Sequence, residues 1–295
     1  MPDPEDGPTV LRIMLGTQLR KLREDRGIST ADAAKAIRAS VSKISRIELG
    51  RSAIREIDVL DLLTHYGVGA EEREQFLTLA EQASRPGWWH NFSDILPDWF
   101  RAYIGMEEAA KSIRVYDPLF VPGLLQTQEY SAAVLALGDL PVTEAERHVV
   151  LRKERQRRFV EGQLKLWAIV DESALRRPVG SPQTLRDQLR YLISLSSRQN
   201  LTLQITSQGV GGFAAPSGFS ILRFGDPEMP DVVYVEQLTS ALYFDKKADV
   251  DRYLLAMERL SIISNKPADT RSILSSIINE LEEKLDDHPQ RNASF

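Results

Sequence analysis

The sequence predicts an α+β chain with two parts. The first is an all-α domain of five helices, and the second is a mixed α/β domain with a small sheet of about four strands. Three observations lead to this prediction. The length of 295 residues is about twice that of a usual domain. Apolar residues recur at helical spacing through the first 84 residues. Alternating apolar patterns typical of strands begin only at residue 164.

The composition excludes several classes of protein. Hydrophobic residues make up 42% of the chain and charged residues 27%, which is typical of globular domains. No apolar run approaches the roughly 20 residues of a membrane-spanning helix, and the amino terminus lacks the pattern of a secretory signal. The chain has no cysteine, which excludes disulfides and suits the cytoplasm. Its four histidines are widely separated, so we expect neither a metal nor a cofactor.

The net charge of −5 hides a local excess of positive charge. Residues 10–55 contain eleven Lys or Arg against four Asp or Glu, a balance of +7. Residues 1–9 contain three acids and no base, and residues 56–85 contain seven acids against two bases. A basic segment between acidic flanks produces the local positive field that favours binding to a phosphate backbone.

The helical part has the pattern of a DNA-binding motif. Ser29, with Asp32 three residues later, is typical of the start of a short helix. After a tight turn, Ser40 is placed to cap another helix, which would bury Ile44 and Ile47. A helix that enters the major groove contacts base edges with its amino-terminal half. The exposed polar residues there are Ser42, Lys43, Ser45 and Arg46.

Residues 38–51, Arg-Ala-Ser-Val-Ser-Lys-Ile-Ser-Arg-Ile-Glu-Leu-Gly-Arg, resemble the recognition helix of XRE-type (Cro/phage-repressor-like) regulators. The resemblance implies that Ser40 caps this helix and that Ser42, Lys43 and Ser45 face bases. It also implies that Arg46 and Arg51 contact phosphate.

The resemblance has further implications at individual positions, two of which depart from the usual family pattern. Val41 stands where many relatives have Arg or Gln, so it offers apolar contact, for instance to a thymine methyl group. Ser29 and Thr30 stand where relatives usually begin the preceding helix with Gln, and both are candidate DNA contacts. By the same resemblance Glu48 forms a structural salt bridge with a first-helix arginine, for which we expect Arg20.

A change in composition near residue 85 marks the expected domain boundary. We expect an acidic tail at residues 1–9 and the helix-turn-helix domain at 10–84. A regulatory and dimerisation domain would span 85–286, and a flexible tail 287–295. The helices predicted in the second domain span 97–115, 126–137, 143–162, 181–199, 248–264 and 268–286. Its predicted strands span 164–170, 201–205, 220–224 and 232–235.

The second domain also carries family motifs. They are Gly-Trp-Trp-His at 87–90, Ser-Asp-Ile-Leu-Pro at 93–97, Val-Pro-Gly-Leu-Leu-Gln-Thr at 121–127, Asp-Glu at 171–172, Leu-Arg-Arg-Pro-Val-Gly at 175–180 and Asp-Val-Val-Tyr-Val-Glu at 231–236. They resemble the uncharacterised domain that follows XRE headpieces in many actinobacterial antitoxin-like regulators. This resemblance implies a transcriptional regulator that is often paired genetically with a small acidic companion protein.

Aromatic residues gather near the expected boundary. Trp88, Trp89, His90 and Trp99 fit a ligand pocket or a partner interface, because aromatic side chains dominate both. They also fit a cluster that holds the two domains together. The sequence leaves both interpretations open.

We find no catalytic constellation. The glycine-rich loop at 208–213 lacks the Lys-Ser/Thr ending of a phosphate-binding loop, and a strand follows it instead of a helix. Basic residues on the 143–162 helix alternate with acids, as on a solvated helix. The predicted function is therefore a sequence-specific regulator, not an enzyme, that binds double-stranded DNA as a homodimer and responds to a partner protein or a small-molecule effector. The alternative is an antitoxin-like module that sequesters a small companion protein.

Overall fold

The computed structural model describes residues 9–50, 52, 54–84, 87–138, 140–207, 215, 217–225 and 229–287. The chain divides into two units, Met1–Ala109 and Ala110–Phe295. The boundary expected from the sequence lies earlier in the chain, near residue 85. Arg51, the glycine-rich loop at 208–213, the residues before 9 and those after 287 lie outside the described residues.

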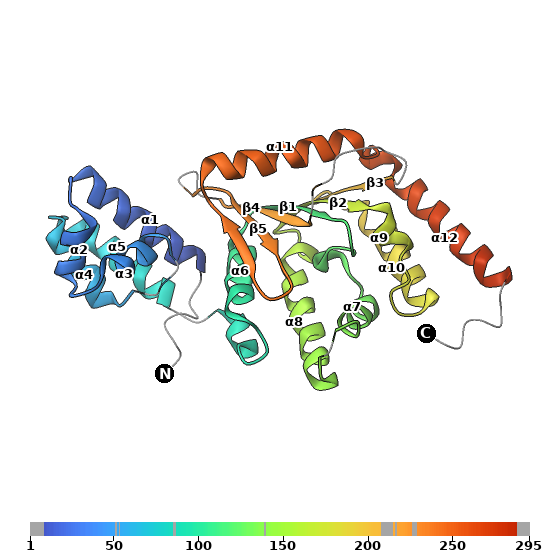
Figure 1. The fold of residues 1–295 in the computed structure, drawn as a ribbon, viewed down its shortest axis with the longest axis horizontal. Helices are drawn as coiled ribbons and strands as arrows, with labels where there is room; N and C mark the ends of the chain where they lie inside the picture. The colour runs from blue at the N-terminus through green and yellow to red at the C-terminus, as the bar shows by residue number, and fades with distance from the viewer. Residues whose placement is uncertain are drawn as a thin grey trace. The chain divides into compact units, whose positions relative to one another are not determined.

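The first unit is helical throughout its described length (Figure 1). The five predicted helices are present, and a 3-10 helix and a further α-helix follow them. In order, these elements are α1 (Thr9–Asp25), α2 (Thr30–Ala36), α3 (Val41–Glu48), α4 (Glu56–His65), α5 (Ala70–Ser84), η2 (Trp88–Phe92) and α6 (Asp98–Ala109). Helices α1–α5 are called the headpiece below.

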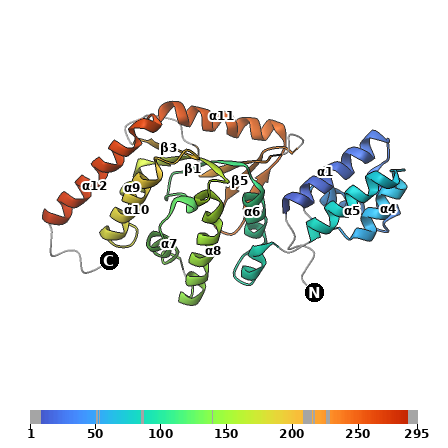
Figure 2. The same ribbon diagram turned by 180° about the vertical axis from the view of Figure 1, so that it is seen from behind.

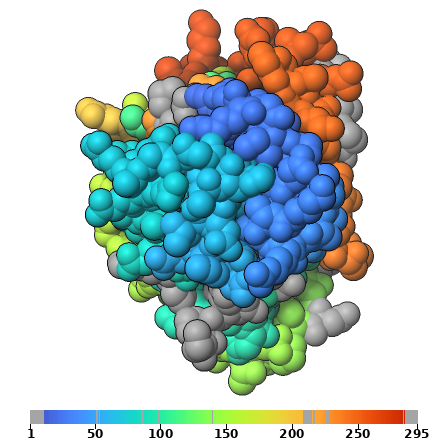
Figure 3. Space-filling model, turned by 90° about the vertical axis from the view of Figure 1, so that its left-hand side faces the viewer, coloured from blue at the N-terminus to red at the C-terminus, as the bar shows by residue number. Residues whose placement is uncertain are grey.

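The headpiece is built around one apolar core. Leu15 and Leu19 of α1 meet Ile44 and Ile47 of α3, and all four side chains are at most 2% exposed. Residues four apart on a helix lie on the same face, so the apolar spacing places these side chains toward one centre. Figure 3 shows the outside of this unit, with the first helices in blue and the following ones in cyan.

The turn between α2 and α3 has an uncommon backbone conformation. Arg38 has a φ of 53°, the one positive φ at a non-glycine residue among those described. The left-handed region costs an L-residue with a side chain roughly 1–2 kcal/mol. The tight turn that sets α3 against α2 therefore includes a strained residue.

The second unit is a mixed α/β domain, as predicted. Its strands are β1 (Ser112–Asp117), β2 (Lys165–Asp171), β3 (Leu201–Thr206), β4 (Phe219–Arg223), β5 (Val232–Glu236) and β6 (Ala241–Phe244). Its helices are η3 (Gly123–Leu125), α7 (Gln128–Leu135), α8 (Val142–Val160), α9 (Glu172–Arg176), α10 (Pro182–Leu195), α11 (Lys247–Ile263), η4 (Pro267–Asp269) and α12 (Thr270–Asp287).

The described strands form one six-stranded sheet in the order β3-β2-β1-β4-β5-β6. Strands β1, β2 and β3 are parallel and are joined by helical crossovers, whereas β4, β5 and β6 continue the sheet as antiparallel neighbours. Helices α7 to α10 lie on one side of the sheet and α11 lies on the other (Figures 1 and 2). Tyr116, Ile169 and Val233 pack with Met257 and Leu260 of α11 on the second side.

The sheet has two strands more than the four predicted. Residues 112–115 were expected to end a helix, but they belong to β1, which pairs with β2 and β4. Pairing on both edges decides the conformation of this short Ile- and Val-containing segment, which local spacing alone left open. β6 is a four-residue edge strand that gives little sequence signal.

The structure also sets two helix starts in the second unit. α8 begins at Val142, after Pro141 and without a side-chain cap, one residue before the predicted start at 143. Asp171 ends β2 and caps α9, where its Oδ1 accepts hydrogen bonds from the backbone N–H and the hydroxyl of Ser173. Asp171 and Glu172 are therefore a strand end and a helix start.

None of the described helices combines the length and the apolar character that a membrane span requires.

Candidate nucleic-acid interface

Both helices of the helix-turn-helix begin at a serine cap. The Ser29 hydroxyl accepts a hydrogen bond from the backbone N–H of Asp32 at 3.1 Å, and the Ser40 hydroxyl accepts one from the backbone N–H of Lys43 at 3.1 Å. Such caps satisfy donors that a helix leaves unpaired in its first turn. Ser40 therefore stabilises the end of α3 that we expect to meet DNA.

Helix α3 has one buried and one exposed face. Ile44 and Ile47 are buried, at 1% and 2% exposed. The opposite face is open to solvent, and four of the predicted contact residues lie together on it: Val41, Ser42, Ser45 and Arg46. No ion pair involves Arg46 within the described part of the chain, which leaves its guanidinium available for a phosphate.

Lys43 lies at the side of this face and has a partner that the sequence analysis missed. Its Nζ is 3.7 Å from Oδ2 of Asp58 in α4. Asp58 is only 2% exposed and also accepts hydrogen bonds from Arg55, at 3.0 Å from Nε and 2.7 Å from Nη2. The local sequence at 55–58 does not predict the contact with Lys43. Asp58 comes close to Lys43 only in the folded headpiece, through the packing of its helices.

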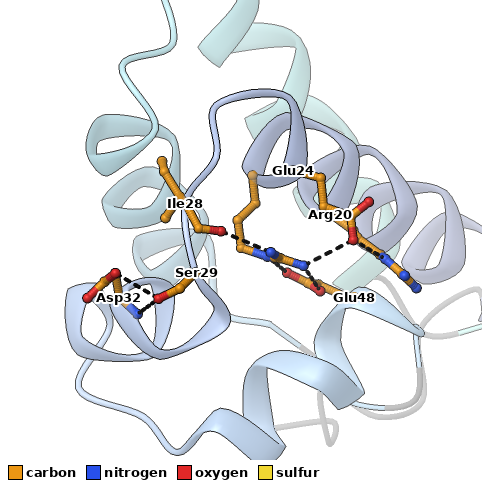
Figure 4. A network of polar contacts seen from close by, with 7 residues as sticks. Arg20, Glu24, Ile28, Ser29, Asp32 and Glu48 are labelled. Carbon is orange, nitrogen blue, oxygen red and sulfur yellow. Dashed lines mark hydrogen bonds and ion pairs between the residues drawn. The ribbon is translucent and has the colours of Figure 1, made fainter.

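The buried salt bridge of the headpiece joins Glu48 to Arg23, not to the predicted Arg20 (Figure 4). Arg23 donates from Nε to Oε1 of Glu48 at 2.6 Å and from Nη2 to Oε2 at 2.9 Å. Arg20 is exposed and pairs with Glu24 at 2.8 Å. The physical reason is helical spacing: Arg23 follows the buried Leu19 by four residues and shares its inward face, whereas Arg20 points away.

A glycine allows α3 to approach α1 closely. A Cβ atom added to Gly16 would lie 2.2 Å from the carbonyl oxygen of Ile47 and 2.9 Å from that of Glu48. A signal that could have found it is the glycine inside the apolar pattern of the first helix, because glycine there costs about 1 kcal/mol relative to alanine. Gly16 therefore sets the position of α3 without itself facing DNA.

Ser29 is exposed, whereas Thr30 is less open than the α3 face. The Ser29 hydroxyl donates a hydrogen bond to Oδ2 of Asp32 at 2.7 Å, and Thr30 is half-buried. The hydrogen bond from Ser29 and the ion pair with Lys35 hold the pKa of Asp32 below its usual value. A carboxylate thus stands beside Ser29 at the start of α2.

The predicted aromatic residues lie in the first unit, on η2 and α6. Trp89 is buried, and the rings of Trp88 and Trp89 meet edge to face at 5.9 Å between their centroids. The indole N–H of Trp88 donates to Glu108 at 3.0 Å. Trp99 contacts Phe100 with their centroids 5.8 Å apart, and His90 lies in the 3-10 helix η2.

Several basic residues of α8 serve the fold of the second unit. Arg158 donates to the carbonyl of Ala110 at 3.2 Å, and Arg152 donates to Gln126 and Ser131. Within the described residues, no group of three or more His, Asp or Glu side chains is arranged to hold a metal ion.

Comparison with protein-family models gave two matches. Residues 14–76 match a model described as a helix-turn-helix domain, and residues 100–276 match one described as a domain of unknown function, DUF5753. Searches of curated proteins and of solved structures found no match.

The fold and the first match define the class: a protein with an amino-terminal helix-turn-helix domain, which suggests DNA binding. The second match spans more than half of the chain, and the protein belongs to the DUF5753 family. Neither matching model is that of an enzyme family.

Proposed function

We propose that this protein is a sequence-specific transcriptional regulator with an XRE-type headpiece that inserts α3 into the major groove of double-stranded DNA. The observation that carries the proposal is the exposed face of α3, where Val41, Ser42, Ser45 and Arg46 lie opposite the buried Ile44. A helix that is anchored by its buried face and polar on its exposed face can contact base edges in the major groove.

Charge supports the same function. The segment 10–55 has a balance of +7 in an otherwise acidic chain. Much of the binding free energy of such proteins comes from counterions that the phosphates release, so affinity should fall steeply as salt rises. Lys43 and Arg46 contribute two cations next to the exposed face of α3.

The test is a gel-shift and anisotropy series on fragments of the protein's own upstream region. The double variant Lys43→Ala, Arg46→Ala should weaken binding at least tenfold and flatten the salt dependence, because each lost phosphate contact lowers the slope by about one unit. Lys165→Ala removes an exposed cation of β2 in the second unit and serves as the matched control. Unchanged affinity of the double variant would refute the assignment of α3.

We further propose that the active form is a homodimer. Two copies of α3 would occupy half-sites about 34 Å apart, one turn of DNA, on an inverted repeat. Analytical ultracentrifugation with and without a duplex containing both half-sites measures the stoichiometry. One protein chain per duplex at saturation would contradict the dimer.

The second unit supplies the regulatory input in this proposal. One candidate input is a small acidic protein encoded beside the gene, favoured by three exposed apolar side chains near the basic helix α8. They are Leu137, Leu140 and Val142, at 64%, 40% and 75% exposed. Val142→Asp in the full chain should abolish co-purification with that protein and leave DNA affinity unchanged. Co-purification that survives the substitution would refute this surface.

The aromatic group of Trp88, Trp89, His90 and Trp99 remains a candidate site for a ligand or a partner. The indole of Trp88 is partly exposed, so tryptophan fluorescence would report binding there. A titration with an effector that leaves the emission flat would count against this group.

A further inference from the structure

The second unit contains a pocket far along the chain from the helix-turn-helix. Its volume is about 240 Å³, and it lies where α7, α8 and α10 meet. Pockets for drug-sized ligands usually measure roughly 300–1,000 Å³, so this pocket suits a small metabolite. Its described lining consists of Gln126, Thr127, Gln128, Ser131, Val149, Arg152, Lys153, Gln156 and Tyr191.

Partly buried hydrogen bonds hold one wall of the pocket in place. Arg152 donates from Nη1 to Oε1 of Gln126 and to Oγ of Ser131, the second at 3.0 Å. Gln126 and Ser131 are only 4% and 2% exposed. Gln156 donates to the carbonyls of Gly123 and Gln126 at 2.8 and 2.9 Å. A wall ordered before the ligand arrives lowers the entropy cost of binding.

The charge of the pocket is positive. Arg152 and Lys153 line it, and its described lining includes no Asp or Glu. Lys153 is exposed, and within the described residues it has no ion-pair partner. The first turn of α7, capped by Thr127, also borders the pocket, and the amino-terminal end of a helix favours negative charge.

The pocket lining also includes apolar surface. Val149 of α8 is nearly buried, and Tyr191 of α10 is half-buried and adds an aromatic ring with a hydroxyl group. Specific small-molecule sites combine such an apolar surface with a few fixed polar groups. The pocket therefore combines cationic side chains with apolar surface.

We propose that this pocket binds a small organic anion. Its carboxylate or phosphate group contacts Lys153 and Arg152, and its carbon skeleton lies along Val149 and Tyr191. The proposal deepens the proposed function, because it names the chemistry of a ligand that regulates the protein. It rests on that function only for the effect of the ligand on DNA binding.

The experiment is calorimetry on the full-length protein without DNA. The probes are inorganic phosphate, acetate, glucose 6-phosphate and citrate, each at constant ionic strength against chloride. We expect saturable binding of one ligand per chain for at least one probe. Lys153→Ala should raise its Kd at least tenfold, and Tyr191→Phe should raise it about threefold. Lys165→Ala, outside the pocket, is the matched control and should leave the Kd unchanged.

The pattern of binding among the four probes identifies the anionic group or overturns the proposal. Binding by both phosphate probes assigns a phosphate group, and binding by acetate and citrate alone assigns a carboxylate. Lack of saturable binding for all four probes, or an unchanged Kd in Lys153→Ala, overturns the proposal. Arg152→Ala would disturb the hydrogen bonds of the wall, so the test uses the exposed Lys153 and the conservative Tyr191→Phe instead.

A gel shift without any anion separates this proposal from the proposed function. If the anion binds and the wild-type protein fails to bind DNA, the proposed function fails and the pocket stands. If DNA binds and no anion does, the pocket fails alone. If both the anion and DNA bind, a saturating anion should change the Kd of the wild-type protein for DNA at least threefold. It should leave the Kd of Lys153→Ala for DNA unchanged.

Discussion

Arg23 and Glu48 form a buried, bidentate ion pair that joins the last part of α1 to the last residue of α3. Arg23 also donates to the carbonyl of Ile28 at 3.0 Å, so the same guanidinium holds the segment leading into α2. The hydrogen bond to Glu48 raises the pKa of Arg23 above its usual value. One arginine thus connects three parts of the helix-turn-helix.

Removing Glu48 should destabilise the headpiece strongly. Glu48→Ala leaves the cation of Arg23 buried without its partner, and such a change costs about 3–5 kcal/mol. Arg20→Ala is the control, because its exposed pair with Glu24 contributes at most about 1 kcal/mol. Urea unfolding followed by circular dichroism measures both. Equal losses in the two variants would contradict the structural role of the buried pair.

Substitutions of two serines, one before α3 and one within it, should have different effects on stability and on DNA affinity. Ser40→Ala removes the cap of α3 and should cost about 1 kcal/mol of unfolding free energy. Ser45→Ala changes an exposed side chain and should leave stability within about 0.5 kcal/mol while weakening specific DNA binding. Denaturation and anisotropy on the same samples compare them. A larger stability loss in Ser45→Ala would be inconsistent with these roles.

Asp58 should restrain the cations next to α3. Asp58→Asn removes the charge that faces Lys43 and Arg55, so both become available to phosphates. We expect non-specific DNA affinity to rise several-fold and the ratio of specific to non-specific binding to fall. Asp61→Asn, an exposed position on the same helix, is the control. Competition with random duplex gives the ratio, and an unchanged ratio in Asp58→Asn would refute the restraint.

Gly16→Ala should move α3. The added Cβ would collide with the backbone at Ile47, and overpacking of this kind costs about 1–3 kcal/mol. Both stability and DNA affinity should therefore fall. Gly225→Ala is the control, because a Cβ there would meet only the Lys111 side chain at 3.9 Å. A Gly16→Ala variant that binds DNA with wild-type affinity would show that the contact between α1 and α3 adjusts to the added Cβ without displacing α3 from its DNA-binding position.

Alkaline pH should destabilise the headpiece through Tyr66. Burial, and to a smaller extent the negative charge of Glu48, raise the pKa of Tyr66 to about 12 from 10.0. A raised folded-state pKa gives stability that is complete below pH 10 and is lost as pH rises toward 12. The corresponding loss in the second unit comes from Tyr130, whose pKa burial also raises to about 12.

Tyr66→Phe isolates the contribution of the headpiece. Among the described residues the hydroxyl of Tyr66 has no hydrogen-bond partner, so its removal should be neutral at pH 7 or stabilise by up to about 1 kcal/mol. The variant should also lose less stability between pH 10 and 12 than the wild type. Urea midpoints across this range provide the measurement, and parallel curves for the two proteins would contradict the assignment.

Much of the headpiece was predictable from local sequence. The serines at 29 and 40 cap helices where their spacing predicted, and Ile44 and Ile47 face inward as the helical period requires. These features depend on residues at most four positions apart. A tight turn before Ser40 was predicted, but the positive φ of Arg38 came from the structure.

The partners of charged residues were less predictable. The resemblance placed Glu48 opposite the first helix, but choosing Arg23 over Arg20 required knowing which face of α1 is buried. Asp58 could not be linked to Lys43 from sequence, because 15 positions and a change of chain direction separate them. The pocket of the second unit likewise combines side chains from three helices.

The sequence by itself determined the helix-turn-helix, its caps and its exposed polar face, because these follow from periodicity and from hydrogen bonds within single turns. Only the tertiary structure decided that residues 112–117 form a strand, because pairing with β2 and β4 on both edges outweighs a weak local preference. It also decided which charges meet. An ion pair depends on distances of a few ångströms between elements, and helix packing sets those distances.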